Sequence, residues 1–296
     1  FILMNNKNFN KGILLTALGS FWWGFFGVIY FKYISFAGYV EVVIHRCVWT
    51  TITLLFTTLL FSKWKIFFSL IKNKKKLLVL LISGFLIFTN WAVWIYAVAT
   101  NRVIDASFGY FIMPIISIFL GYFFFNEKIT NKSKLSILIV TISIFYLLLI
   151  DFRSLPWVGL IVALVWSIYN LVRKKINVDT DTGLLIESLF ILPFALIAFS
   201  IITKNNLNDF DISNPSLMFI LMLAGPMTVI PLFLYVRGVE YCGLGPTGMI
   251  FYITPTLQFL LGYFFYNEPF NIEKLVSFIL IWIAVFIYLR DLYENN

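Results

Sequence analysis

Long apolar blocks are the feature of this sequence that most constrains its fold. Each block runs for roughly 20 residues, the length that an α-helix needs to cross the hydrocarbon layer of a bilayer. The charged residues amount to only 12% of the chain, about half the fraction of a typical soluble domain. We therefore predict an all-α integral membrane protein with ten transmembrane helices. The ten blocks lie at residues 12–31, 39–61, 77–98, 104–125, 134–150, 155–172, 184–203, 216–236, 245–266 and 274–290.

The first block has a second interpretation, because Lys7 and Lys11 precede it as they would precede a signal peptide. The block runs for about 20 residues and has no clear small-residue cleavage site, so a retained helix is favoured. The two cysteines, Cys47 and Cys242, lie in different halves and form no CxxC motif. They suggest neither a disulfide framework nor a metal site, and no cofactor is expected.

The basic residues alternate between loops, and this alternation predicts the orientation of the chain. With the N-terminus inside, the inside segments hold 16 of the 22 Lys and Arg residues, the outside loops hold five, and Arg46 lies within a block. Basic residues accumulate in cytoplasmic loops, so both termini are predicted to be cytoplasmic, in a multi-pass protein of the inner or plasma membrane. The net charge of +8 then needs no nucleic-acid partner. The basic segment 62–76 is expected to contact anionic lipid.

An internal repeat divides the chain into two halves. The segment PIISIFLGYFFFNE (114–127) matches PTLQFLLGYFFYNE (255–268) at 8 of 14 positions with a shift of 141 residues. A weaker match relates WGFFGVIYFK (23–32) to WSIYNLVRKK (166–175). We predict a tail at 1–11, a five-helix repeat at 12–150, a second at 151–290 and a tail at 291–296.

Five helices per repeat is an odd number, so the second repeat must enter the membrane from the opposite side. Inverted repeats of this kind suit a transporter that opens alternately to either face around a central site. Glu127 would then end its helix at the inner face and Glu268 at the outer face. A plainer interpretation of the repeated phrase is a helix end with a packing glycine, interfacial aromatic residues and Asn-Glu in water.

Several segments together resemble one known group, the drug/metabolite transporter superfamily with paired EamA domains, and within it the RarD-type chloramphenicol-sensitivity proteins. The resemblance covers essentially the whole chain. It implies ten helices, with the first four of each half around a central cavity and the fifth and tenth set apart. It does not identify one substrate. The segments that carry it are VIHRCVW (43–49), NWAVWIYAV (90–98), DASFGYFIMPIISIFLGYFFFNE (105–127), LVRKK (171–175), TGLLIESLFILP (182–193) and PTLQFLLGYFFYNEPF (255–270).

Ionisable residues deep in the apolar blocks are candidates for function, because a charge in hydrocarbon is costly. Glu41 and His45 are four residues apart and share one helix face, whereas Arg46 is turned about 100° from His45. We predict that His45 and Arg46 line the cavity, with Arg46 binding an anionic group of the substrate; a structural bond from Arg46 to backbone carbonyls is the alternative. His45, Glu187 and Glu41 are the candidates for carrying a coupling proton. Glu187 could instead bind a cationic amine of the substrate or lie at the inner interface of the membrane.

Amide, aromatic and proline residues complete the candidate site. The amides suit hydrogen bonds to a polar substrate or between helices, and the aromatic residues suit stacking or plain packing. The prolines break backbone hydrogen bonds, which makes them candidate bending points of the pathway or simple kinks. The further substrate-binding candidates are Asn90, Trp91, Trp94, Tyr110, Tyr252 and Gln258, and the candidate bending points are Pro114, Pro255, Pro226 and Pro231.

The predicted function is therefore that of a secondary transporter for a small amphiphilic metabolite or drug, with proton coupling or exchange as driving force. A lipid-handling or scaffold protein is the first alternative and a channel the second. An enzyme is not expected, because one His and two separate Cys provide neither an HExxH motif nor a metal-ligand set, and no Gly-rich phosphate loop occurs. The expected partners are the small-molecule substrate and membrane lipid, in a monomer or homodimer.

Overall fold

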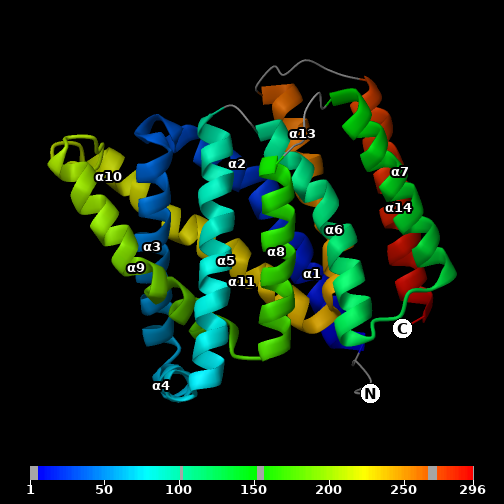
Figure 1. The fold of residues 1–296 in the computed structure, drawn as a ribbon, viewed down its shortest axis with the longest axis horizontal. Coiled ribbons are helices and arrows are strands. Elements are labelled where there is room, and N and C mark those ends of the chain that lie inside the picture. Colours follow the sequence, from blue (N-terminus) through cyan, green and yellow to red (C-terminus); the bar gives the residue numbers. More distant parts are fainter. Residues whose placement is uncertain (1–5, 101–102, 152–156, 266–271, 296) are drawn as a thin grey trace.

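The chain forms a bundle of helices, and the part of it that the structure describes contains no β-strand (Figure 1). This structure is a computed structural model that describes residues 6–100, 103–151, 157–265 and 272–295. The first half contains α1 (Asn6–Trp22), a π-helix η1 (Trp23–Gly27), α2 (Val28–Tyr33), a 3₁₀ turn η2 (Ile34–Ala37), α3 (Gly38–Leu60), α4 (Trp64–Lys72), α5 (Lys74–Ala99), α6 (Val103–Phe125) and α7 (Asn131–Asp151). The second half contains α8 (Trp157–Ile176), α9 (Thr180–Lys204), α10 (Pro215–Met222), α11 (Ala224–Cys242), α12 (Leu244–Ile250), α13 (Ile253–Phe265) and α14 (Ile272–Asn295).

These helices follow the predicted apolar blocks, with three differences. The basic segment 62–76, predicted as a loop, contains the short helix α4. The block 216–236 is interrupted at Leu223, and the block 245–266 is interrupted at Phe251 and Tyr252. The second interruption has a clear cause: Pro255 has no N–H to donate to the carbonyl of Phe251, which accepts from the N–H of Thr254 instead (2.9 Å).

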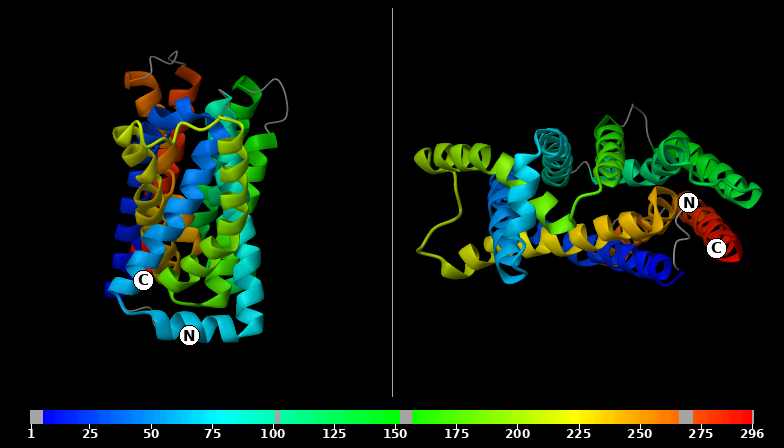
Figure 2. Two further views of the ribbon diagram at one scale, coloured as in Figure 1. Left: turned by 90° about the vertical axis from the view of Figure 1, so that its left-hand side faces the viewer. Right: turned by 90° about the horizontal axis from the view of Figure 1, so that it is seen from below.

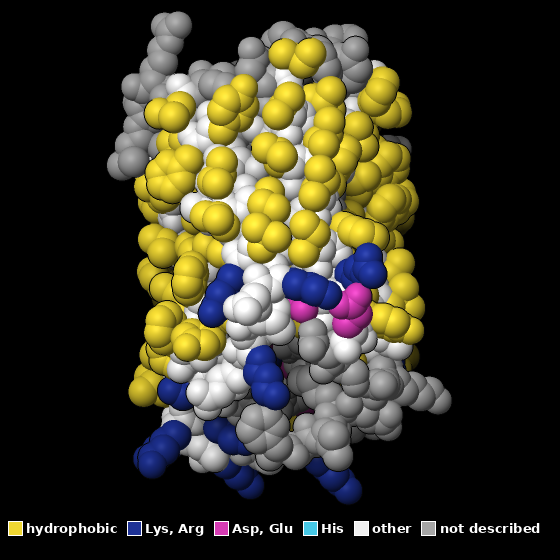
Figure 3. Space-filling view, turned by 90° about the vertical axis from the view of Figure 1, so that its right-hand side faces the viewer, with side chains coloured by type: hydrophobic (Ala, Val, Ile, Leu, Met, Phe, Trp, Pro, Cys, Tyr) yellow, Lys and Arg dark blue, Asp and Glu magenta, His cyan; other side chains and the backbone are white. Residues whose placement is uncertain are grey.

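The sides of the bundle are strongly apolar. Large hydrophobic side chains such as Phe123 and Leu149 are exposed there, at 71% and 84%. Figure 3 shows one such side, where hydrophobic side chains cover the upper part and Lys and Arg gather toward the lower end. An apolar side surface with helical, internally hydrogen-bonded backbone is what a bilayer requires. Six described segments are long and apolar enough to cross a membrane: Asn8–Leu60, Lys74–Ala97, Trp157–Ile176, Thr180–Lys204, Pro215–Cys242 and Leu275–Glu294.

The predicted count of ten spans is compatible with this arrangement but is not established by it. The run Asn8–Leu60 contains two of the predicted blocks, 12–31 and 39–61, and Gly109–Phe125 is a shorter apolar helix. The coarser prediction, an all-helical protein with several membrane-spanning helices, is confirmed.

The helices pair across the two halves of the chain rather than within each half. α1 packs on α11 and α8 packs on α5, while α3 packs on α9 and α7 packs on α14. Figure 2 shows the α7–α14 pair at one end of the elongated cross-section and α3 with α9 and α10 at the other. At the contact between α6 and α8, a Cβ on Gly109 would lie only 2.3 Å from the carbonyl oxygen of Gly159. Small residues thus allow the backbones to approach closely.

One end of the bundle carries α4, the start of α1 and the end of α14 (Figure 1); we call it the basic end. Here Lys63 bonds to Asp181 and, at 3.0 Å, to Asp179, which caps the N-terminus of α9. Burial disfavours the charged form of Lys63, but the hydrogen bonds to the two aspartates outweigh it and raise the pKa of Lys63. Burial also acts against the charge of Asp179, and its bonds from Lys63 and Thr182 outweigh that and lower its pKa. The ion pairs therefore join α3 to α9 at this end.

Candidate functional site: a central aromatic cavity

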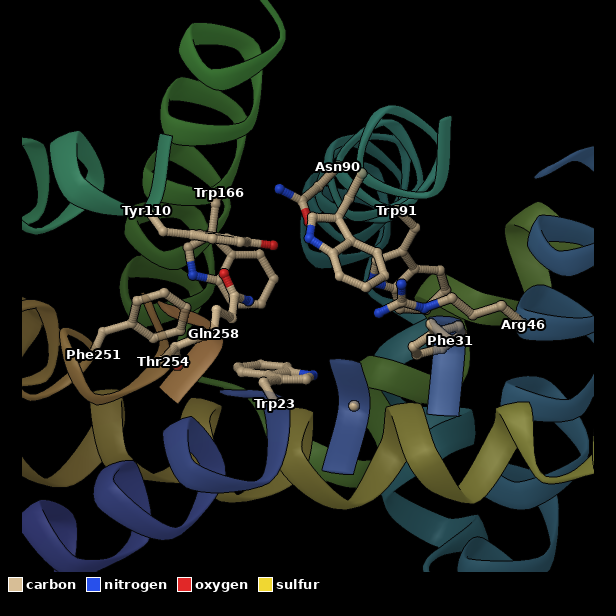
Figure 4. A pocket seen from close by; sticks show the side chains of 12 residues that line it. Trp23, Phe31, Arg46, Asn90, Trp91, Tyr110, Trp166, Phe251, Thr254 and Gln258 are labelled. Carbon is tan, nitrogen blue, oxygen red and sulfur yellow. The ribbon is translucent and has the colours of Figure 1, made fainter. Parts of the chain in front are cut away.

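A cavity lies inside the bundle, between segments of both halves (Figure 4). The lining is mainly aromatic, with one cation and three uncharged polar side chains. It consists of Trp23, Gly27, Phe31, Arg46, Asn90, Trp91, Trp94, Tyr110, Trp166, Phe251, Thr254 and Gln258.

Two irregular helix segments face this cavity. One is the π-helix η1, which contributes Trp23 and Gly27 to the lining. The other is the interruption between α12 and α13, which lies beside η1: the hydroxyl of Thr254 donates to the carbonyl of Ser20 (3.0 Å), and α13 packs on η1. π-helical turns within α-helices occur frequently at functional sites, and irregular backbone at membrane depth is tolerated where it borders protein or a cavity.

Residues related by the internal repeat contact each other at the cavity. Trp23 and Trp166 occupy matching positions of the two halves, and their ring centroids are 5.3 Å apart. Tyr110 and Phe251, related by the shift of 141 residues, have ring centroids 5.5 Å apart. Equivalent positions in two copies can touch only near the axis that relates the copies. The cavity therefore lies where the two halves meet.

Arg46 is the only Lys or Arg among the described lining residues. It is 5% exposed, and its guanidinium carbon lies 4.7 Å from the ring centroid of Phe31 and 4.8 Å from that of Trp91. Its Nε has no hydrogen-bond partner. None of the ion pairs among the described residues includes Arg46. The aromatic faces stabilise the cation in part, and the unpaired N–H leaves a donor for an acceptor that enters the cavity.

The other polar side chains of the lining are uncharged. Asn90 is buried, and its Nδ2 donates a long hydrogen bond to the carbonyl of Val162 (3.4 Å). Thr254 and Gln258 lie on α13, and Figure 4 shows them on the side of the cavity opposite Arg46. No acidic side chain lines the described wall of the cavity, so its fixed charge is positive.

Six of the predicted substrate-binding residues lie in this lining, and His45 does not. The helix turn that brings Arg46 to the cavity turns His45 away from it. The His45 ring lies 3.3 Å from Glu41 Oε1, accepts a hydrogen bond from Trp49 (3.2 Å) and packs on Phe210. The structure thus separates two residues that we expected to share the cavity. The six that line it are Arg46, Asn90, Trp91, Trp94, Tyr110 and Gln258.

Glu41 holds the loop that follows α9 rather than facing the cavity. Its carboxylate accepts hydrogen bonds from the backbone N–H groups of Asp209 (2.8 Å) and Phe210 (3.0 Å). Tyr252 is also outside the lining: its hydroxyl donates to the carbonyl of Phe111 (2.8 Å), and its neighbour Phe251 takes the place at the cavity that we expected for it.

Glu187 lies in a separate buried polar cluster. Its carboxylate is 3.3 Å from Nη1 of Arg173 and accepts hydrogen bonds from Ser83 (2.5 Å) and Tyr169 (3.1 Å). These groups come from α5, α8 and α9. Glu187 borders a second, smaller pocket together with Trp91, a residue that also lines the central cavity.

The predicted bending points have different local structures. Pro114 and Pro231 lie inside the continuous helices α6 and α11. Pro226 follows the interruption at Leu223, and Pro255 follows the interruption at Phe251 and Tyr252. Only the last two therefore lie just after a break between two helices.

Sequence reasoning missed several lining residues, namely Trp23, Phe31, Trp166, Thr254 and Gly27. The match between Trp23 and Trp166 in the repeat was the available signal, because equivalent residues near the symmetry axis face a common centre. No group of three or more His, Cys, Asp or Glu side chains that could hold a metal ion occurs among the described residues. Glu268 of the second repeated phrase lies outside the described residues.

Comparisons with known proteins agree with this architecture. The model of the EamA-like transporter family matches the chain twice, at residues 10–149 and 155–290. The protein RarD of Salmonella typhi is 34% identical over 97% of both chains, and an uncharacterized transporter of Vibrio cholerae is 31% identical over 98% of this chain and 96% of its own. A solved crystal structure at 14% identity shares the fold, with a TM-score of 0.66 over 94% of this chain and 96% of the other. The chain therefore belongs to the EamA-like transporter family, as a RarD-type member of the drug/metabolite transporter superfamily.

Proposed function

We propose that this protein is a secondary transporter that moves a small amphiphilic metabolite or drug across the cell membrane by alternating access. In this proposal ten helices span the membrane as two inverted repeats, 12–150 and 151–290. Both termini lie in the cytoplasm, so the basic end is the inner end.

The observation that carries the proposal is the position of the central cavity. Both repeats build it, and matching residues of the repeats, Trp23 with Trp166 and Tyr110 with Phe251, meet at it. A site on the axis between two inverted halves can be exposed to one face or the other by a rocking motion of one half against the other. The pairing of α1 with α11 and of α8 with α5 supports the same symmetry.

The driving force would come from proton coupling or from exchange. Glu187, Glu41 and His45 are the buried titratable groups available for a proton. Uptake that keeps the same rate from about pH 5.5 to about pH 8, in the wild type and in both His45→Gln and Glu187→Gln, would exclude proton coupling through those two side chains.

Thiol accessibility tests the proposal. Gln258 lines the cavity and is half-buried, so Gln258→Cys in a Cys47→Ala, Cys242→Ala background should react with a membrane-impermeant maleimide added from either face. Leu138→Cys is the matched control: Leu138 is 55% exposed on the side of α7, where lipid should shield it from both faces.

Reaction of Gln258→Cys from one face only, under all conditions of substrate and pH, would contradict alternating access. Large voltage-gated currents through the reconstituted protein would instead favour a channel.

A further inference from the structure

Arg46 is a buried cation with no acidic partner among the residues that the structure describes. Burying a guanidinium without an anion is unfavourable, and a partner is normally present within the protein or in the medium that fills the site. Here the Nε is unpaired and the described lining has no carboxylate. The nearest acidic residue on the same helix, Glu41, binds the backbone of Asp209 and Phe210.

The second repeat shows how such a charge is neutralised when the protein supplies the partner. Glu187 lies 141 residues after Arg46, the shift that also relates the repeated phrases. It pairs with Arg173 on α8 at 3.3 Å. In the first repeat the shift between Trp23 and Trp166 places Tyr30 at the position of Arg173, and the Tyr30 hydroxyl donates to the carbonyl of Ile220 (2.8 Å). The repeats therefore differ in the described part of the chain: Glu187 has an ionic partner there and Arg46 has none.

The aromatic residues around Arg46 leave its N–H groups available to an anion in the cavity. The guanidinium carbon lies 4.7 Å from the ring centroid of Phe31 and 4.8 Å from that of Trp91, and a guanidinium that stacks on aromatic rings keeps its N–H edge available. Figure 4 shows the guanidinium nitrogen atoms pointing toward the interior of the cavity. A carboxylate matches that edge, because it can accept two parallel hydrogen bonds.

The far side of the cavity is suited to an apolar, planar group. Trp166, Tyr110 and Phe251 lie there, with Trp23 between them and Arg46 (Figure 4). A ligand with an anionic group at one end and a ring at the other would satisfy both ends of the cavity at once.

We infer that Arg46 binds the anionic group of the substrate, and that the transported substrates are amphiphilic monoanions with an aromatic part. This inference rests on the proposed function, since it assigns a substrate class to the same cavity. It also gives the two repeats different arrangements at equivalent positions: Arg46 is available to the substrate, whereas Glu187 is paired with Arg173 within the protein.

Three probes that share one ring test the inference: indole-3-acetate, indole-3-acetamide and tryptamine, which are anionic, neutral and cationic. Binding is measured by titration calorimetry on the full chain in lipid nanodiscs. The acetate should bind about tenfold more tightly than the amide, because charge-assisted hydrogen bonds are roughly twice as strong as neutral ones. Tryptamine should bind more weakly than the amide.

Arg46→Gln should abolish the preference for the acetate over the amide, and Arg46→Lys should retain part of it. Arg237→Gln is the matched control, because it makes the same change at a half-buried arginine outside the described lining of the cavity. The melting temperature of each variant shows whether it is folded, and Arg46→Lys keeps the test decisive if Arg46→Gln is not.

The inference is overturned if the wild-type protein binds the amide or tryptamine as tightly as the acetate. It is also overturned if Arg46→Gln still prefers the acetate. Failure of the inference differs from failure of the proposed function. If Trp166→Ala binds the amide more weakly than the wild type does, the cavity is still the binding site, even when the protein shows no preference for the anion. One-sided labelling of Gln258→Cys would reject alternating access whatever the indole probes do.

Discussion

Glu187 combines the properties of a coupling group and of a structural group. It is buried, with Arg173, Ser83 and Tyr169 within hydrogen-bond or ion-pair distance. A carboxylate with three partners is well satisfied, so its removal should affect the fold first. Arg173 has few bonds apart from its ion pair with Glu187. Its Nε and Nη1 have no hydrogen-bond partner, and its other terminal nitrogen donates to the carbonyl of Thr180 (3.3 Å).

Glu187→Gln should therefore destabilise the protein by about 3 kcal/mol, because it leaves the Arg173 cation buried and unpaired. The melting temperature in detergent, measured with and without lipid, reports the loss. Arg173→Met should be destabilising for the converse reason. The double variant should be more stable than the sum of the two losses predicts, since it removes both charges.

Additive losses in that cycle would show that the two side chains do not interact. His45→Gln is a useful comparison, because it changes another buried titratable residue whose nearest acidic group, Glu41, keeps its bonds to Asp209 and Phe210.

At the scale of elements, the repeated phrase has a definite role in its first copy. Asn126 follows α6 with φ of 51°, a left-handed conformation that asparagine adopts more readily than most residues. The turn brings the Glu127 carboxylate onto the N-terminal N–H groups of α12, where it accepts from Leu244 and Gly245 (both 2.9 Å). It also accepts from Lys174 of α8 (2.8 Å). The interpretation of Asn-Glu as simply dissolved in water is wrong for Glu127.

Gly121 makes room for this contact, since a Cβ there would lie 2.4 Å from Glu127 Oε2. One carboxylate thus joins the ends of α6, α8 and α12 at the basic end. Because α12 continues into the cavity wall through Phe251, this junction connects the basic end to the cavity.

Glu127→Gln should loosen α12, because it replaces charge-assisted hydrogen bonds, worth about 1.5–3 kcal/mol each, with neutral ones. Hydrogen exchange of the amides of Leu244 to Ile250 should become faster. Gly121→Ala should have the same effect by displacing the carboxylate. Glu294→Gln is the matched control: Glu294 forms ion pairs with Lys132 and Arg290 on the exposed surface of the same end. Unchanged exchange in Glu127→Gln would mean that other contacts hold α12.

At the scale of the whole molecule, the pairing of helices across the halves explains why neither half forms a core of its own. The most extensive helix contacts, α1 with α11, α6 with α8, α7 with α14 and α3 with α9, each join one repeat to the other. The two ends of the bundle differ in charge, which suits one orientation in the membrane.

Impermeant thiol labelling of intact cells should therefore modify Leu207→Cys and spare Lys74→Cys until the membrane is permeabilised. Leu207 is 69% exposed, in the loop between α9 and α10 at the end opposite α4 (Figure 1). Lys74 begins α5 at the basic end. Wild-type protein is the blank, because Cys47 and Cys242 are buried. Labelling of Lys74→Cys in intact cells would reverse the proposed orientation.

The sequence by itself determined the features that depend on length and composition. Apolar blocks of about 20 residues predict membrane helices because the thickness of hydrocarbon sets that length. The sequence also showed the repeat, the uneven distribution of basic residues and the position of Arg46 as a single basic residue deep in an apolar block. Six of the residues that line the cavity were among the predicted ones, and for Arg46 the reason was that a charged side chain deep in a span needs an internal partner.

Only the tertiary structure decided which face of each helix looks inward. These helices are apolar on nearly all sides, so hydrophobic periodicity, which identifies the buried face of a helix in a soluble protein, does not distinguish the inward face from the lipid face here. His45 and Arg46 were therefore both expected at the cavity, and packing against α5 and the loop after α9 separated them. The partner of Glu187 and the contact of Trp23 with Trp166 join residues that are distant along the chain. Such pairs form only when the two halves dock, because docking sets the distances on which they depend.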